Sequence, residues 1–416
     1  MQAQSRTYPL ILLLAAVAAL VPLSVGIYLP GLPAIALDLG ASTARVQMSV
    51  ALWLAGLCVG SLVGGPMSDH YGRRPLLLAA LALYGLSSLG CWSADNVAEL
   101  LICRVAQGLG AGAALVVVRA VACDVFAPGQ AQRALSWIHA LALLTALAAP
   151  VVGTWLMALD GWHSLFGVLC LLGLGCAVAV WLRLEESHGT DPDDARPLDT
   201  AHAGRRAGRA SLGALVTAYL RVLSDRQAVS LLLCTAFSYG GVFAFVTASP
   251  FVFIDNFGFS PWAFSAVAAL GTVGALLMVV LDARRAALAA PLTLLKFAAW
   301  VTAGTGLVLT GTSLLGIAVP GVIVVGALAY VGISAVIGAR CTASLRTLFA
   351  READTASRLA LAIQLASAAV FSWLVSAFAD GTAMPMCVAM GIGGAGCLLG
   401  FWGLVEDQEA GEIAGR

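Results

Sequence analysis

Long apolar stretches alternate with short polar turns along the whole chain. A helix needs about 20 apolar residues to cross roughly 30 Å of hydrocarbon, and the pattern predicts two sets of six such helices. The first set covers residues 9–30, 46–67, 76–94, 98–120, 134–158 and 164–183. The second set covers residues 228–251, 261–281, 288–311, 314–338, 355–378 and 384–405. The chain is therefore expected to be an all-α polytopic membrane protein with 12 transmembrane helices, whose boundaries are least distinct between 282 and 338.

The two sets are separated by the only long polar stretch, residues 184–227. Most of it has the composition of a flexible linker without a site, while 211–223 favours an amphipathic helix at the membrane surface. We therefore expect an N-terminal six-helix bundle over 1–183, a cytoplasmic linker over 184–227 and a C-terminal six-helix bundle over 228–416.

Composition supports the membrane class and excludes several others. The chain is 60% hydrophobic and 11% charged, which is more apolar surface than a soluble domain can bury. Its 10 cysteines lie mostly inside apolar runs, without Cys-x-x-Cys or His-x-x-x-His spacing, so no metal and no cofactor is expected. No nucleotide-binding loop, nucleophile motif or basic patch outside the loops is present, which argues against ATP drive, an enzyme and nucleic-acid binding.

The arginines predict the orientation. If the N-terminus is cytoplasmic, sixteen arginines fall on the inner side and the outer loops hold only Arg45. Positive residues concentrate on the cytoplasmic side of membrane proteins. We therefore expect both termini in the cytoplasm and a multi-pass protein of the cell inner membrane, in contact with the lipid bilayer.

A short polar turn follows the second apolar stretch, with the sequence Gly65-Pro66-Met67-Ser68-Asp69-His70-Tyr71-Gly72-Arg73-Arg74. Its brevity makes the flanking helices antiparallel neighbours. The simplest interpretation is a cytoplasmic loop that carries the positive charges usual on that side of the membrane. A weaker echo, Asp282-x-Arg284-Arg285, follows the eighth stretch.

This order of residues resembles the loop between the second and third spans of the major facilitator superfamily. The first half is further similar to the Bcr/CflA drug-resistance branch of the twelve-span drug:proton antiporters. The motifs are Tyr28-Leu29-Pro30-Gly31-Leu32-Pro33, Arg104-Val105-Ala106-Gln107-Gly108, Ala149-Pro150-x-x-Gly153, Gly161-Trp162-His163-Ser164-Leu165-Phe166 and Ala248-Ser249-Pro250-Phe251. The similarity covers about two thirds of the chain and thins beyond residue 280.

The resemblance implies the major facilitator fold, with the substrate path between two bundles that rock by alternating access. It implies a monomer that transports a small molecule and exchanges it for protons. It also implies that charges at the inner ends of the second and fourth spans form a gating cluster. The residues carried over are Asp69, Arg73, Arg74, Arg119 and Asp124. Pro150 and Gly153 correspond to the helix-bend motif of the antiporters.

Arg104 lies inside the fourth span, where burying an arginine costs about 2.5–3.5 kcal/mol or more. It either reaches the outer surface or belongs to the proton or substrate machinery, together with Gln107 one helical turn away. Relatives usually carry an Asp at the position of Gly26, so the obvious proton carrier is missing here. His139 in the fifth span is a titratable substitute, since histidine titrates near pH 6.5, or else a hydrogen-bonded polar residue near the inner surface.

The cavity between the bundles is expected to be mostly apolar with a few polar groups. Preferred lining residues are Tyr28, Gln47, Tyr239, Phe243 and Gln364, with further aromatic candidates at Trp53, Trp137, Phe245, Tyr330 and Trp373. The leading functional hypothesis is a proton-coupled exporter of small amphipathic drugs or metabolites. The alternatives are a facilitator or dedicated metabolite exporter without proton coupling, which Gly26 favours, and a non-transporting membrane receptor.

Overall fold

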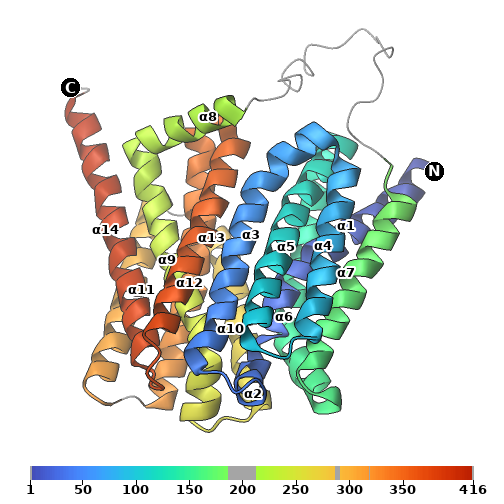
Figure 1. The fold of residues 1–416 in the computed structure, drawn as a ribbon. Helices are drawn as coiled ribbons and strands as arrows, with labels where there is room; N and C mark the ends of the chain where they lie inside the picture. Colours follow the sequence, from blue (N-terminus) through green and yellow to red (C-terminus); the bar gives the residue numbers. More distant parts are fainter. Residues whose placement is uncertain (1, 186–211, 286–290, 318, 415–416) are drawn as a thin grey trace.

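The structure is a computed structural model that describes residues 2–185, 212–285, 291–317 and 319–414 (Figure 1). Every regular element in this part of the chain is helical. Among the described residues, 12 helices are long and apolar enough to cross a membrane. The predicted all-α fold with 12 spans is confirmed.

The first half of the chain forms a bundle of long helices. Its elements are α1 (Gln2–Gly26), η1 (Leu29–Gly31), α2 (Leu32–Asp38), α3 (Thr43–Tyr71), α4 (Arg73–Trp92), α5 (Val97–Val125), α6 (Pro128–Asp160) and α7 (His163–Arg183). The three segments from α1 to α2 together make the first span.

The second half repeats this arrangement after a short extra helix. Its elements are α8 (Leu212–Ser224), α9 (Arg226–Pro250), η3 (Phe251–Asn256), α10 (Pro261–Arg285), α11 (Pro291–Leu314), α12 (Pro320–Leu348), η4 (Ala350–Glu352), α13 (Ala353–Ala377) and α14 (Met384–Ala414). The helix predicted near 211–223 is α8, which packs against α9 and α13 and buries Val222. Most of the predicted linker, 186–211, lies outside the described residues.

Both ends of the described chain lie at the same end of the bundle, together with α8 (Figure 1). We call this end the termini face and the other end the opposite face. The antiparallel path of the chain then places the α3–α4 turn at the termini face, and η1, α2 and η3 at the opposite face.

Two predicted spans differ from the observed helices. The first span was expected to be continuous over 9–30, but α1 ends at Gly26 and the chain continues through η1, with Pro30, into α2, with Pro33. The tenth span was expected over 314–338, but α12 runs over Pro320–Leu348. Pro320 stands in the first turn, where a missing amide hydrogen costs nothing. The helix continues past Arg340, whose guanidinium pairs with the carboxylate of Asp282 on α10.

Small residues let helices within each half approach closely. A Cβ atom built on Gly60 of α3 would lie 2.2 Å from the carbonyl oxygen of Leu109 on α5, so only glycine fits there. The same holds at Gly153 of α6, whose Cβ would lie 2.2 Å from the Ile27 carbonyl oxygen. Close packing of this kind takes the place of the hydrophobic effect between helices inside a bilayer.

Two helix pairs make the main contacts between the halves: α3 packs on α13, and α6 packs on α10. The α3–α13 contact reaches the termini face, where a Cβ built on Gly65 would lie 3.3 Å from Nη1 of Arg358. Near the middle, the Cys58 thiol donates to the Ala362 carbonyl oxygen at 3.4 Å. The guanidinium of Arg358 on α13 therefore lies against the first half of the chain.

Candidate functional site: a termini-face charge cluster, a buried arginine and a cavity

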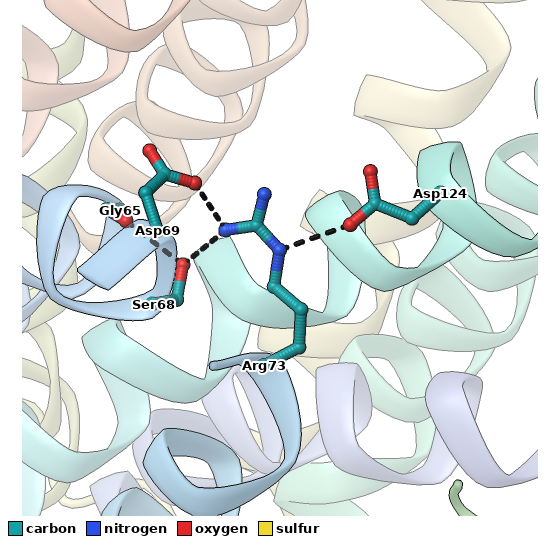
Figure 2. A network of polar contacts seen from close by, with 5 residues as sticks. All are labelled: Gly65, Ser68, Asp69, Arg73 and Asp124. Carbon is teal, nitrogen blue, oxygen red and sulfur yellow. Dashed lines mark hydrogen bonds and ion pairs between the residues drawn. The ribbon is translucent and has the colours of Figure 1, made fainter. Parts of the chain in front are cut away.

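A charge cluster occupies the turn between α3 and α4 (Figure 2). Gly72 is the only residue between the two helices and adopts φ +97°, which favours glycine. Arg73 is the first residue of α4, where a positive charge interacts unfavourably with the helix dipole. Asp69 lies in the last turn of α3, where a negative charge is unfavourable for the same reason. Arg73 offsets both effects, because its Nη1 bonds Asp69 Oδ1 at 2.5 Å and its Nε bonds Asp124 Oδ2 of α5 at 3.0 Å. Nη1 also donates to Ser68 Oγ at 2.5 Å.

Two further arginines expected in this cluster have different partners. Arg74 donates to the carbonyl oxygen of Trp181 in the last turn of α7, so it caps that helix. Arg119 pairs with Asp354 of α13 at 3.2 Å, which makes it a contact between the two halves. Both side chains of this pair are largely exposed, so the pair contributes little stability on its own.

The second half carries its own ion pair at the equivalent place. Asp282 of α10 accepts from Nε of Arg340 of α12 at 2.8 Å and from Nη2 at 2.9 Å. The second half therefore repeats the charged motif of the first half, as expected. Its positive charge comes from Arg340, however, while Arg284 and Arg285 are exposed. The side chains of Asp282 and Arg340 are only 14% and 10% exposed, so this pair is more enclosed than Asp69 with Arg73.

Arg104 lies fully buried inside the first half and does not reach a surface. Its guanidinium carbon is 4.5 Å from the ring centre of Tyr28, 5.3 Å from that of Trp53 and 5.9 Å from that of Phe166. Aromatic faces attract cations at such distances. Nη1 donates to Gln107 Oε1 at 2.5 Å, as expected for two residues on one helix face.

A chain of hydrogen bonds extends from Arg104 through three helices. Gln107 Nε2 donates to Ser88 Oγ of α4 at 2.7 Å, and Ser88 donates to the Tyr84 carbonyl oxygen at 2.7 Å. The Tyr84 hydroxyl in turn bonds Ser24 Oγ of α1 at 2.7 Å. The network thus links α5, α4 and α1 around one buried positive charge.

No carboxylate belongs to the contacts found for Arg104 among the described residues. Its Nε and Nη2 have no hydrogen-bond partner there, and neither does Nε1 of Trp53. Gly26 does not leave an open position where an acid would fit, because a Cβ would lie 2.6 Å from Cβ of Ala149 on α6. Glycine at position 26 thus allows α1 to pack closely on α6.

His139 is not part of this network. It lies exposed on α6, with Nδ1 2.7 Å from the Leu135 carbonyl oxygen of its own helix. The structure therefore separates His139 from Arg104 and Gln107, with which it was grouped in the prediction, and it matches the alternative of a hydrogen-bonded polar residue.

The halves are joined at the opposite face by hydrogen bonds between α6 and α10. Thr154 Oγ1 and Ser265 Oγ lie 2.7 Å apart, and Ser265 Oγ donates to the Pro150 carbonyl oxygen at 2.9 Å. Both hydroxyl groups are buried. We call Thr154, Ser265 and Pro150 the α6–α10 contact. Pro150 stands within α6, and its carbonyl oxygen gives this expected motif residue a role between the halves.

A cavity of about 730 Å³ lies among α9, α10, α12 and α13. All its lining residues belong to the second half, and it is flanked by α10 and α13, the helices that pack on α6 and α3 of the first half. Its polar lining residues are Tyr239, Ser334, Thr342, Arg346 and Gln364, and the others are valine, alanine and glycine. The lining extends to Arg346, two residues before α12 ends at the termini face.

Of the expected substrate-binding residues, Tyr239 and Gln364 line this cavity. Phe243 supports it indirectly, since its ring centre lies 5.2 Å from that of Tyr239. Gln47 instead lines a hollow of about 60 Å³ at the opposite face. Tyr28 is fully buried, with its hydroxyl 2.8 Å from Ser49 Oγ, so in this conformation it packs against Arg104 and lines neither space.

Some of the wider aromatic set also lies elsewhere. Trp137 and Trp373 are 61% and 50% exposed, whereas Trp53 packs on Arg104. Sequence reasoning missed Ser24, Ser88 and Ser334, because a serine inside a span gives no signal of its own. Tyr84 was more accessible to inference, as a polar aromatic residue in the middle of the third predicted span.

Comparison with known proteins decides the family. Residues 14–358 match the Major Facilitator Superfamily. The chain belongs to this superfamily. The assignment confirms a multi-pass membrane transporter of the inner membrane, as expected.

Named relatives agree with the drug-resistance branch that the motifs indicated. The chain is 28% identical over 392 residues, 94% of either chain, to the bicyclomycin resistance protein homologue of Haemophilus influenzae. It is 36% identical over 255 residues to the uncharacterized MFS-type transporter YdgK of Bacillus subtilis. That match spans 61% of this chain and 60% of YdgK. The multidrug resistance protein MdtL of Klebsiella pneumoniae is 30% identical over 61% of each chain.

Solved structures share the fold. The D-xylose–proton symporter superposes with a TM-score of 0.70 at 17% identity, over 95% of this chain and 96% of the symporter. An inward-facing bacterial homologue of the lysosomal transporter Spinster gives 0.68 at 15% identity, over 96% of this chain and 95% of the homologue. At such low identity these likenesses establish the architecture alone.

Proposed function

We propose that the protein is a proton-coupled exporter of small amphipathic molecules that works by alternating access between two six-helix bundles, residues 1–183 and 228–416. In this proposal the termini face is cytoplasmic and the monomer is the working unit. The observation that carries the proposal is the cavity, which extends to the termini face while the α6–α10 contact joins the halves at the opposite face. This arrangement supports access to the cavity of the second half from the termini face, where Arg119 and Asp354 still join the two halves. The names of the relatives support small toxic compounds as cargo.

In this proposal each part of the candidate site has its own role. The charge cluster of Asp69, Arg73 and Asp124 stabilises one arrangement of α3, α4 and α5 at the termini face, and Arg119 with Asp354 adds a contact between the halves. A bistable contact of this kind biases which face opens. Tyr239 and Gln364 contribute to cargo binding.

Arg104 and Gln107 are proposed as the coupling element. A guanidinium with unpartnered N–H groups in an apolar region is costly, and intramembrane ionisable residues commonly belong to ion or substrate pathways. Movement of α1 or α4 would change the hydrogen-bond partners around Arg104, since the network joins both helices to α5.

Transport without proton coupling is the second candidate. It is favoured by one observation: the described contacts of Arg104 include no carboxylate. Gly26, where the resemblance implies an acid, agrees with it. In that case the protein would be a facilitator or a dedicated metabolite exporter.

Everted membrane vesicles separate the two candidates. Bicyclomycin, the compound in a relative's name, is a suitable first probe within a panel of small antibiotics. We expect accumulation of at least one compound against its gradient, abolished when an ionophore collapses the pH gradient. Accumulation only to equilibrium, unaffected by the ionophore, would establish the facilitator instead.

A further inference from the structure

The cavity in the second half has an uneven distribution of polar groups. Seven of its twelve lining residues are valine, alanine or glycine, so most of the wall is apolar. A volume of about 730 Å³ lies within the range of small-molecule pockets. The cavity therefore fits a small organic molecule with a substantial apolar body.

Charge in the lining is of one sign. Arg346 is the one charged residue among the described residues that line the cavity, and no Asp or Glu joins it there. Arg346 is exposed and stands at the termini-face end of α12. Asp282 of α10, a helix that also contributes to the cavity wall, is already engaged by Arg340. A cationic cargo would meet an unfavourable charge at the mouth of the cavity and find no compensating carboxylate along the described wall.

Ser334 marks a deeper point on the same helix. Its side chain is buried and its hydroxyl has no hydrogen-bond partner among the described residues. An unsatisfied buried hydroxyl costs free energy that a ligand can recover. Twelve residues separate Ser334 from Arg346, which corresponds to roughly 18 Å along an α-helix. The cavity thus combines a cation at the mouth, an apolar middle and an unsatisfied hydroxyl deeper inside.

We propose that the cargo bound by this cavity is an amphipathic organic anion, such as a carboxylate on an aromatic or aliphatic body. Its anionic group lies at Arg346 and its apolar body lies along α12 toward Ser334. The inference rests on the proposed function, because it names the class of molecule that the exporter carries. It separates this protein from a carrier of lipophilic cations.

Three probes with one apolar body and different charge test the inference. Naphthaleneacetate is an anion, naphthaleneacetamide is neutral and naphthaleneethylamine is a cation. Binding of each is measured by calorimetry to the full-length protein in lipid nanodiscs, with empty nanodiscs as the blank. The variants are Arg346→Gln, Arg346→Glu and the control Arg284→Gln, which changes an exposed arginine at the termini face outside the cavity lining.

The expected order of affinity in the unmodified protein is anion, then amide, then amine. Arg346→Gln should raise Kd for the anion roughly three- to tenfold, the scale of a partly solvated ion pair, and leave the amide unchanged. Arg346→Glu should make the amine the tightest of the three, and Arg284→Gln should change nothing.

Two results would overturn the inference, and they differ in what they imply for the exporter. If the amine binds as tightly as the anion, or if Arg346→Gln changes no affinity, the anion assignment fails while the cavity keeps its role as the cargo site. If none of the three probes binds, both the anion assignment and the placement of cargo in this cavity fail.

Discussion

The two halves share one fold but differ in what their interiors contain. The first half is closed around Arg104, whose partners come from α1, α3, α5 and α7 and which no surface reaches. The second half has no equivalent buried charge in its described core but holds the large cavity that ends at Arg346. Under the proposed function, the difference teaches that coupling and cargo binding reside in different halves. Rocking of the two halves would then link proton coupling to cargo binding.

The largest effect is expected from removing the charge of the first half. Arg104→Met should lower transport at least tenfold, because it removes the only charged group of the network while filling similar volume. Stability should stay the same or rise, since replacing a buried ion by an apolar side chain is often neutral or stabilising. Transport in vesicles and the melting temperature of purified protein measure the two effects. Normal transport by Arg104→Met would remove Arg104 from the coupling machinery.

Filling the cavity of the second half should have the next largest effect. Ala339→Trp places an indole among the apolar lining residues and should weaken cargo binding about tenfold or more. The matched control is Val325→Trp, which puts the same side chain at a 69% exposed position of the same helix. Equal affinities in the two variants, measured with any transported compound, would show that cargo binds elsewhere.

The two ion pairs at the termini face offer a sharper contrast between the halves. Asp69→Asn should leave the protein inserted and nearly as stable, because Arg73 keeps Asp124, yet depress transport severalfold by weakening the charge cluster. Asp282→Asn should instead mainly lower stability, because it leaves the enclosed Arg340 without a charge partner. Transport at equal membrane abundance, together with melting temperatures, separates these outcomes. Unchanged transport in Asp69→Asn would argue against a gating role.

The smallest effect is expected at the α6–α10 contact. Thr154→Val removes one buried hydrogen bond, worth about 1 kcal/mol or roughly fivefold in the population of the closed opposite face. Amide hydrogen exchange in residues 29–38 and 251–256 should quicken accordingly. The control is Thr145→Val on the same helix, whose hydroxyl bonds only the carbonyl of its own turn at Leu141. Equal exchange in the two variants would show that the contact does not hold this face closed.

Most of the fold could be predicted from the apolar stretches of the sequence. Span length and positive charge predict twelve helices, and the turn at Gly72 predicts the α3–α4 hairpin. Both features depend on residues that are close together in the sequence. The tenth span was misplaced because its polar end depends on Asp282, which lies 58 residues away in sequence from its partner Arg340.

The candidate site was less accessible for the same reason. Arg104 and Gln107 were found because they share a helix face, whereas the hydroxyls of Ser24 and Ser88 become partners only through packing of α1 and α4. Arg346 looked like an ordinary positive residue at a helix end. Only the arrangement of four helices makes it the charged part of a cavity.

The most direct test is cargo-driven proton movement in proteoliposomes that enclose a pH-sensitive dye, using a compound whose transport has been established. The account predicts that a cargo gradient moves protons in the unmodified protein. It further predicts that Arg104→Met moves none, although it binds cargo with unchanged Kd. Established cargo transport by the unmodified protein without any proton movement would contradict the account.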